Sequence, residues 1–128
     1  MTAADPRCYV YPVLFRSWHD GDTAKITLDL GLRTRWEGNC RVVGINAPEL
    51  RDPGGYEALK FAEQLVPPGT VRPCQSVAMD SFGRPLIAID LGTTTGFDGF
   101  ARAMLEAGMA VIYRRDLEEH GYRVGGTT

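Results

Sequence analysis

The order in which extended and helical segments follow one another most constrains what this 128-residue chain can fold into. Three stretches rich in β-branched and aromatic residues come first, divided by turn residues at Asp20-Gly21 and Gly31-Leu32. A stretch with helical spacing follows, then two more extended stretches around a turn, and then a second helical stretch. The predicted strands span residues 8–18, 23–30, 33–45, 70–79 and 84–91, and the predicted helices span 56–66 and 97–108.

This order predicts a mainly β fold with helices, of the α+β class. A helix between the third and fourth of five strands is typical of an OB-fold-like barrel, and a second helix follows the fifth strand. Gly44, inside the third strand, indicates a bulge or a close approach of another segment. Residues of the second strand alternate in polarity, which predicts one buried face formed by Ala24, Ile26, Leu28 and Leu30.

The length and the hydrophobic content of 44% fit a single domain with a packed core. We expect a flexible N-terminus at 1–8, the folded domain at 9–115 and a polar, disordered tail at 116–128. The chain lacks a basic start followed by a long apolar run, and no stretch reaches transmembrane length. These features predict a cytoplasmic protein, with secretion after removal of a leader as the alternative.

Charge and cysteine content exclude several classes of function. The net charge of -2 provides no general attraction to nucleic acid, so such binding would depend on local arginines. The three cysteines form no Cys-x-x-Cys or Cys/His pattern. This odd, scattered set argues against a disulfide framework and against a structural zinc site.

Polar residues gather where the second predicted strand begins and the third one ends. Asp22 follows the turn at Asp20-Gly21, while Asn46 and Ala47 follow the third strand. If these strands are neighbours, a carboxylate, an amide oxygen and the Ala47 carbonyl meet at one rim of the barrel. Such oxygen donors suit a hard cation such as calcium. Each residue alone also has a structural explanation, because Asp and Asn are common turn residues.

Two arginines and a carboxylate flank these positions. Arg41 lies in the third strand, Glu49 follows that strand, and Arg84 leaves the turn at 80–83. Two guanidinium groups beside a cation and a carboxylate can hold a phosphate and stabilise the charge of phosphoryl transfer. The structural alternatives are a salt bridge from Arg41 to Glu37 and an ordinary polar turn residue at Arg84.

Five short motifs connect these residues to a known family. They are DGDT at 20–23, RVVGINAPE at 41–49, GYEA at 55–58, DSFGR at 80–84 and LEAGMA at 105–110. In residue types and order they resemble the staphylococcal nuclease (thermonuclease) family over most of residues 9–113. The resemblance implies a nuclease that hydrolyses phosphodiester bonds of DNA or RNA with calcium, favours single strands and leaves 3′-phosphates.

The resemblance also implies a role for each matching residue. Glu49 would activate or orient the attacking water, and Arg41 and Arg84 would hold the phosphate and stabilise its transition state. The metal ligands would be Asp22, Asn46 and the backbone carbonyl of Ala47.

The chain departs from the family pattern at several positions. Asn46 replaces an aspartate, which removes one negative charge from the metal site, and Ser81 and Phe82 replace a lysine and a tyrosine. Phe82 keeps a surface on which a base can stack, and we assign it to substrate binding together with Tyr113. The longer segment at 23–40 resembles relatives from bacterial and phage genomes.

The sequence thus predicts a monomeric, calcium-dependent nuclease whose partner is DNA or RNA and not a membrane. The alternative is a catalytically weakened or inactive module of the same fold that binds nucleic acid or protein. A third possibility is an adaptor without nucleic-acid contact, which the slightly acidic net charge permits.

Overall fold

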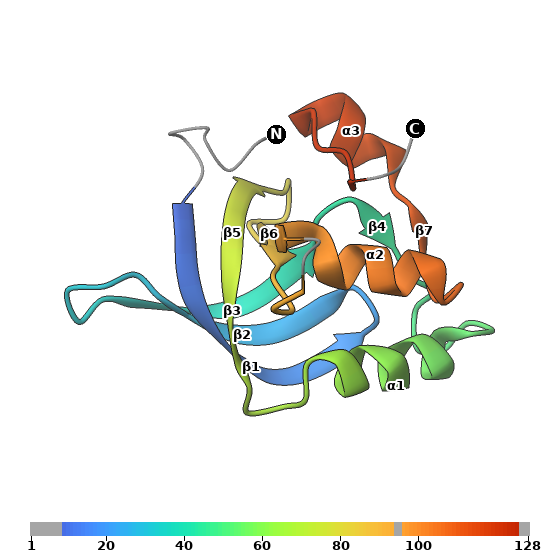
Figure 1. Ribbon diagram of the computed structural model, residues 1–128, viewed down its shortest axis with the longest axis horizontal. Helices are drawn as coiled ribbons and strands as arrows, with labels where there is room; N and C mark the ends of the chain where they lie inside the picture. Colours follow the sequence, from blue (N-terminus) through green and yellow to red (C-terminus); the bar gives the residue numbers. More distant parts are fainter. Residues whose placement is uncertain (1–8, 94–95, 126–128) are drawn as a thin grey trace.

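The computed structural model describes residues 9–93 and 96–125 and contains a closed barrel of five strands (Figure 1). The predicted flexible N-terminus at 1–8 and residues 126–128 of the predicted tail lie outside the described part. Around the barrel the strand order is β1-β2-β3-β6-β5. The strands are β1 (Tyr9–Asp20), β2 (Thr23–Asp29), β3 (Arg35–Val42), β5 (Val71–Met79) and β6 (Pro85–Ile89).

Helices and a small sheet lie beside the barrel. The first helix comes between the third and fourth barrel strands and the second comes after the fifth, so the predicted OB-fold-like architecture is confirmed. Within the described residues, no helix is both long enough and apolar enough to cross a membrane. The elements are α1 (Gly55–Leu65), η1 (Gly96–Asp98), α2 (Gly99–Glu106), α3 (Arg114–His120), and the paired strands β4 (Ile45–Asn46) and β7 (Val111–Ile112).

The barrel closes through a short parallel pairing between β3 and β6, whereas its other neighbours are antiparallel. Arg41 of β3 lies opposite Leu86 of β6, and Arg84 precedes Leu86 by two positions. Arg84 directly precedes β6, which begins at Pro85. The closure therefore brings Arg41 and Arg84 to the same end of the barrel.

Trp18 connects the barrel to its helices. Its ring stacks between Phe15 and Phe100, with centroid distances of 5.5 and 5.0 Å, and its Nε1 donates a hydrogen bond to the Val66 carbonyl at 2.9 Å. The side chain thus joins β1 to α2 and to the end of α1. Removal of such a buried aromatic residue typically costs about 3–5 kcal/mol.

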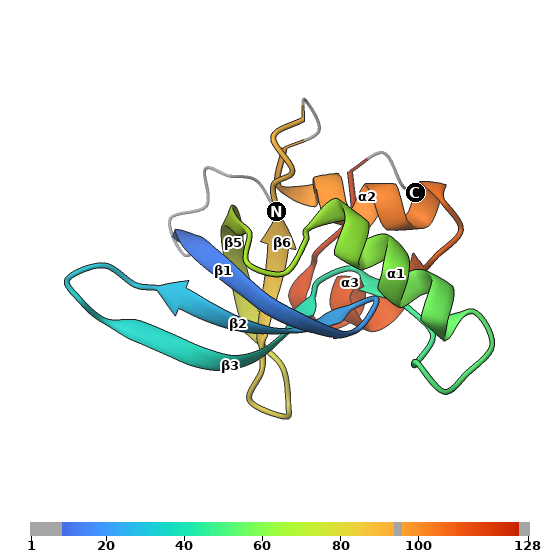
Figure 2. The ribbon, with the colours of Figure 1, turned by 90° about the horizontal axis from the view of Figure 1, so that it is seen from below.

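The β2–β3 hairpin extends beyond the body of the barrel (Figures 1 and 2). Ala24, Ile26 and Leu28 are buried, as the alternation predicts. The prediction that Leu30 shares this buried face is wrong, because β2 ends at Asp29 and Leu30 is 38% exposed. The hairpin has left the core at that point, so no other element covers it.

The C-terminal segment is folded, and the prediction of a disordered tail is wrong for residues 116–125. Residues 114–120 form α3, and Tyr122 and Val124 are buried. They pack against the turn at Gly44, where an added Cβ would lie 2.7 Å from Val124 Cγ2. The close approach predicted at Gly44 is therefore confirmed. The segment is mostly polar, and its two buried apolar side chains are too few to produce a recognisable sequence pattern.

Candidate functional site

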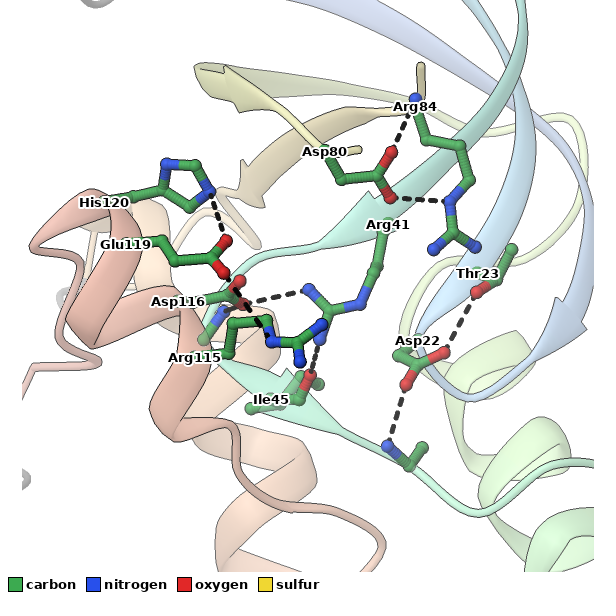
Figure 3. Close-up of polar contacts among 12 residues, drawn as sticks. Asp22, Thr23, Arg41, Ile45, Asp80, Arg84, Arg115, Asp116, Glu119 and His120 are labelled. Carbon is green, nitrogen blue, oxygen red and sulfur yellow. Dashed lines mark hydrogen bonds and ion pairs between the residues drawn. The ribbon is translucent and has the colours of Figure 1, made fainter. Parts of the chain in front are cut away.

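Asp22 ties the β1–β2 turn to the segment that follows β3. Its side chain is buried, Oδ2 accepts a hydrogen bond from the Ala47 N–H at 2.8 Å, and Oδ1 accepts one from Thr23 Oγ1 at 3.0 Å. The Val42 N–H donates to the Asp22 carbonyl at 2.8 Å. The predicted neighbourhood of Asp22 and Ala47 is thus present at the barrel rim (Figure 3).

A second buried carboxylate, Asp20, lies beside Asp22. Its Oδ1 accepts a hydrogen bond from the Asp22 N–H at 3.2 Å. Burial is the main cause that raises the pKa of Asp20 to about 7, and hydrogen bonding to Asp22 and the negative charge of that residue add to it. Two desolvated carboxylates in this position favour a shared proton or a bound cation. From the sequence Asp20 was predicted only as a turn residue, although two acids around one glycine, Asp20 and Asp22, are a usable signal.

Glu49 and Arg84 line one open groove next to this carboxylate pair. Glu49 is exposed, and its Oε2 lies 3.0 Å from Nε of the exposed Arg51. Arg84 lies directly before β6, and its side chain is about one-third exposed. We call this surface the Glu49 groove, and its lining residues are His19, Asp20, Thr23, Glu49, Leu50, Arg51 and Arg84.

The β5–β6 turn holds Arg84 in place. Asp80 Oδ2 accepts a hydrogen bond from Arg84 Nε at 2.7 Å, and Asp80 Oδ1 accepts one from the Arg84 backbone N–H at 2.8 Å. Burial acts to raise the pKa of Asp80, but hydrogen bonds from Arg84 and from the Phe82 N–H outweigh it and lower that pKa. The Arg84 guanidinium also lies 5.5 Å from the centre of the Phe82 ring.

Arg41 is buried and has a different set of partners. Nη1 donates to Asp116 Oδ2 at 2.9 Å, and Nη2 donates to the Ile45 carbonyl at 2.8 Å (Figure 3). The guanidinium carbon lies 4.3 Å from the centre of the Tyr113 ring. The salt-bridge alternative named Glu37 as the partner of Arg41 and is wrong, since Glu37 of β3 pairs with Arg16 of β1 and Arg41 pairs with Asp116.

Arg41 and Arg84 meet in a second groove, between the β5–β6 turn and α3. Phe82 and Tyr113, the predicted substrate-binding residues, line it as well. We call it the Arg41 groove. Because Arg84 belongs to both grooves, it connects Glu49 with Arg41. Asp116, the residue that holds Arg41, was missed because it lies in the predicted tail. The lining residues are Arg41, Asp80, Ser81, Phe82, Arg84, Leu86, Tyr113, Arg115, Asp116, Glu119 and His120.

Asn46 and Ala47 line a third groove, formed with residues of α1 and β7. Asn46 is exposed and pairs with Val111 in the β4–β7 sheet. Of the predicted metal ligands, the structure therefore joins Asp22 to Ala47 but does not bring Asn46 into the Glu49 groove. The part of the chain that the structure describes contains no cluster of three or more His, Cys, Asp or Glu side chains that could hold a metal ion.

The donors at the rim nevertheless fit a hard cation in their chemistry. Asp20 and Asp22 offer carboxylate oxygens and Thr23 offers a hydroxyl, and burial beside Asp22 raises the pKa of Asp20. Neither a scan of protein-family models nor a search of curated proteins found a match to this chain.

Proposed function

We propose that this chain is a calcium-dependent nuclease that hydrolyses phosphodiester bonds in single-stranded DNA or RNA and leaves 3′-phosphates, in the manner of the staphylococcal nuclease family that its motifs resemble. The observation that carries the proposal is the Glu49 groove, where a carboxylate and an arginine line one surface beside two buried aspartates. This combination suits attack on a phosphodiester.

Each group has a defined task in this proposal. Glu49 takes the proton of the attacking water or orients that water. Arg84 donates to the equatorial phosphate oxygens, and Arg41 donates from the adjoining groove. Asp22 and the Ala47 carbonyl, with Asp20 beside them, would hold calcium, which when bound would neutralise phosphate charge. Phe82 and Tyr113 would contact the bases or sugars that flank the cleaved bond.

The proposal is tested by incubating purified protein with a labelled single-stranded DNA oligonucleotide, in millimolar calcium and in excess chelator. Wild-type protein is expected to cut only with calcium. Glu49→Ala and Arg84→Ala should lower the rate by about 10²-fold or more, as loss of an acid–base group or a transition-state donor does. Glu106→Ala, which removes an exposed carboxylate on α2, is the matched control and should retain the rate. Wild-type rates in both site variants would exclude this assignment.

A second candidate is a non-catalytic module that binds nucleic acid or protein. It is favoured by the internal ion pairs Arg41–Asp116 and Arg84–Asp80, which already neutralise both guanidinium groups. Asn46 in place of a carboxylate also favours it. Such a module binds single-stranded DNA without calcium and with an affinity that falls steeply with salt, because phosphate contacts release counterions. Binding of this kind without cleavage would identify the second candidate.

A further inference from the structure

We propose that Asp116 is a positioning residue for Arg41, so that the C-terminal segment forms part of the site. The inference rests on the proposed nuclease function. Asp116 is 3% exposed, and its Oδ2 accepts hydrogen bonds from Arg41 Nη1 at 2.9 Å and from the Gly44 N–H at 2.7 Å. One carboxylate oxygen therefore holds both the guanidinium and the turn that follows β3.

The guanidinium of Arg41 is fixed from three directions. Asp116 accepts from Nη1, the Ile45 carbonyl accepts from Nη2, and the Tyr113 ring lies along one face. An arginine side chain has many rotamers, and ordering it costs up to about 2 kcal/mol of conformational entropy. Here that cost is met in the folded protein, before any substrate binds. The remaining N–H groups of Arg41 can donate hydrogen bonds to a phosphate.

The segment that carries Asp116 is itself held in several places. The Tyr113 N–H donates to the Gly44 carbonyl at 2.9 Å, and the Tyr122 N–H donates to the Asp116 carbonyl at 3.3 Å. Tyr122 and Val124 are buried against Gly44. Asp116 is therefore anchored on both sides in the sequence, which lets it act as a fixed acceptor rather than a mobile surface acid.

A neutral variant separates positioning from mere folding. Asp116→Asn keeps an oxygen that can accept from Gly44 but removes the charge that orients Arg41. We expect kcat on single-stranded DNA to fall about tenfold or more with KM little changed, because a displaced transition-state donor affects kcat. In an Arg41→Lys background, Asp116→Asn should then change kcat by less than about twofold, since the two residues act as one unit. Urea unfolding confirms that each variant is folded.

A matched control loosens the same segment without touching Arg41. Asp98 occupies the N-cap position of α2, but its Oδ2 accepts a hydrogen bond from the Gly125 N–H. Asp98→Ala removes this anchor, and kcat should remain within about twofold of wild type. If Asp116→Asn does not fold, Asp116→Glu replaces it, and its longer side chain should also lower kcat by displacing the carboxylate.

The outcomes distinguish the two proposals. An active wild type whose kcat is unchanged in Asp116→Asn, or falls equally in the Arg41→Lys background, overturns the role of Asp116 and leaves the nuclease proposal standing. An equal loss of kcat in Asp98→Ala would show that Asp116 only stabilises the fold. A folded wild type without activity overturns the nuclease proposal and the inference with it.

Discussion

Arg41 in β3 and Arg84 just before the neighbouring strand β6 carry the same charged group, but their surroundings differ. Arg41 pairs with a residue 75 positions away, and its side chain is 9% exposed. Arg84 pairs with a residue four positions away, and its side chain is 32% exposed. One guanidinium is organised by the tertiary structure and the other by a local turn. The two are therefore expected to share a catalytic role but to differ in what they contribute to stability.

The largest expected effect is the loss of free energy of unfolding when Arg41, rather than Arg84, is replaced by alanine. Arg41→Ala leaves the buried carboxylate of Asp116 without its ionic partner, which should lower the free energy of unfolding by about 3–5 kcal/mol. Arg84→Ala removes a partly exposed pair and should cost about 1 kcal/mol or less. Urea unfolding of both variants measures the difference, and equal losses would show that the two surroundings are equivalent.

The turn that supports Arg41 provides the next test. Gly44 and Gly69 both have φ near +91°, but a Cβ at Gly44 would meet Val124 and Tyr122, whereas one at Gly69 meets nothing within 4 Å. Gly69→Ala should therefore cost only the backbone strain of about 1–2 kcal/mol. Gly44→Ala should cost roughly a further 1–3 kcal/mol, because the added methyl group would crowd Val124 and Tyr122. Chemical denaturation gives both values, and equal costs would mean that the C-terminal segment does not pack on this turn.

Asp20 makes the stability depend on pH. Its pKa is about 7 in the folded protein and about 3.9 in an unfolded chain, so the folded state holds the extra proton between these values. The stabilisation is complete below about pH 4 and is lost as the pH rises through 7. Asp20→Asn should therefore increase stability relative to wild type more at pH 8 than at pH 5. Asp52→Asn, at an exposed position, is the control. If the stability of Asp20→Asn depended on pH as that of the wild type does, the burial of the Asp20 charge would be contradicted.

The smallest expected effect lies at the exposed end of the Arg84 region. Phe82 is 82% exposed, so Phe82→Ala should change the free energy of unfolding by less than about 0.5 kcal/mol. If a base stacks on this ring, the affinity for single-stranded DNA should fall about tenfold. Leu32→Ala, fully exposed on the distant β2–β3 hairpin, serves as the control in the same fluorescence-anisotropy titration. Equal affinities for the two variants would remove Phe82 from the interface.

The difference between the two arginines also shows which features a sequence can predict: those set by local patterns. Alternating and helical patterns are local, so the order of strands and helices along the chain and the barrel type were predictable, as was the turn that presents Arg84. The neighbourhood of Asp22 and Ala47 followed from the barrel, because its strands meet at one rim. Asp116 could not be found in this way, since its partner lies 75 residues away and most of its neighbours in sequence are charged.

Asn46 illustrates a further limit of sequence reasoning. Its position in the motif suggests a metal ligand, but β4 is only two residues long and pairs with β7, which leaves the side chain exposed in another groove. The direction of a side chain in so short a strand depends on a partner that is distant in sequence. A motif can therefore place a residue near a site without fixing where its side chain points.

The most direct test of the account is the chemistry of the products. A defined single-stranded DNA oligonucleotide is incubated with calcium and either wild-type or Glu49→Ala protein. The masses of the fragments are then determined by mass spectrometry. We expect fragments with 3′-phosphate and 5′-hydroxyl ends from the wild type and intact oligonucleotide from the variant over the same time. Intact oligonucleotide after incubation with folded wild-type protein, or equal fragmentation by Glu49→Ala, would contradict this expectation.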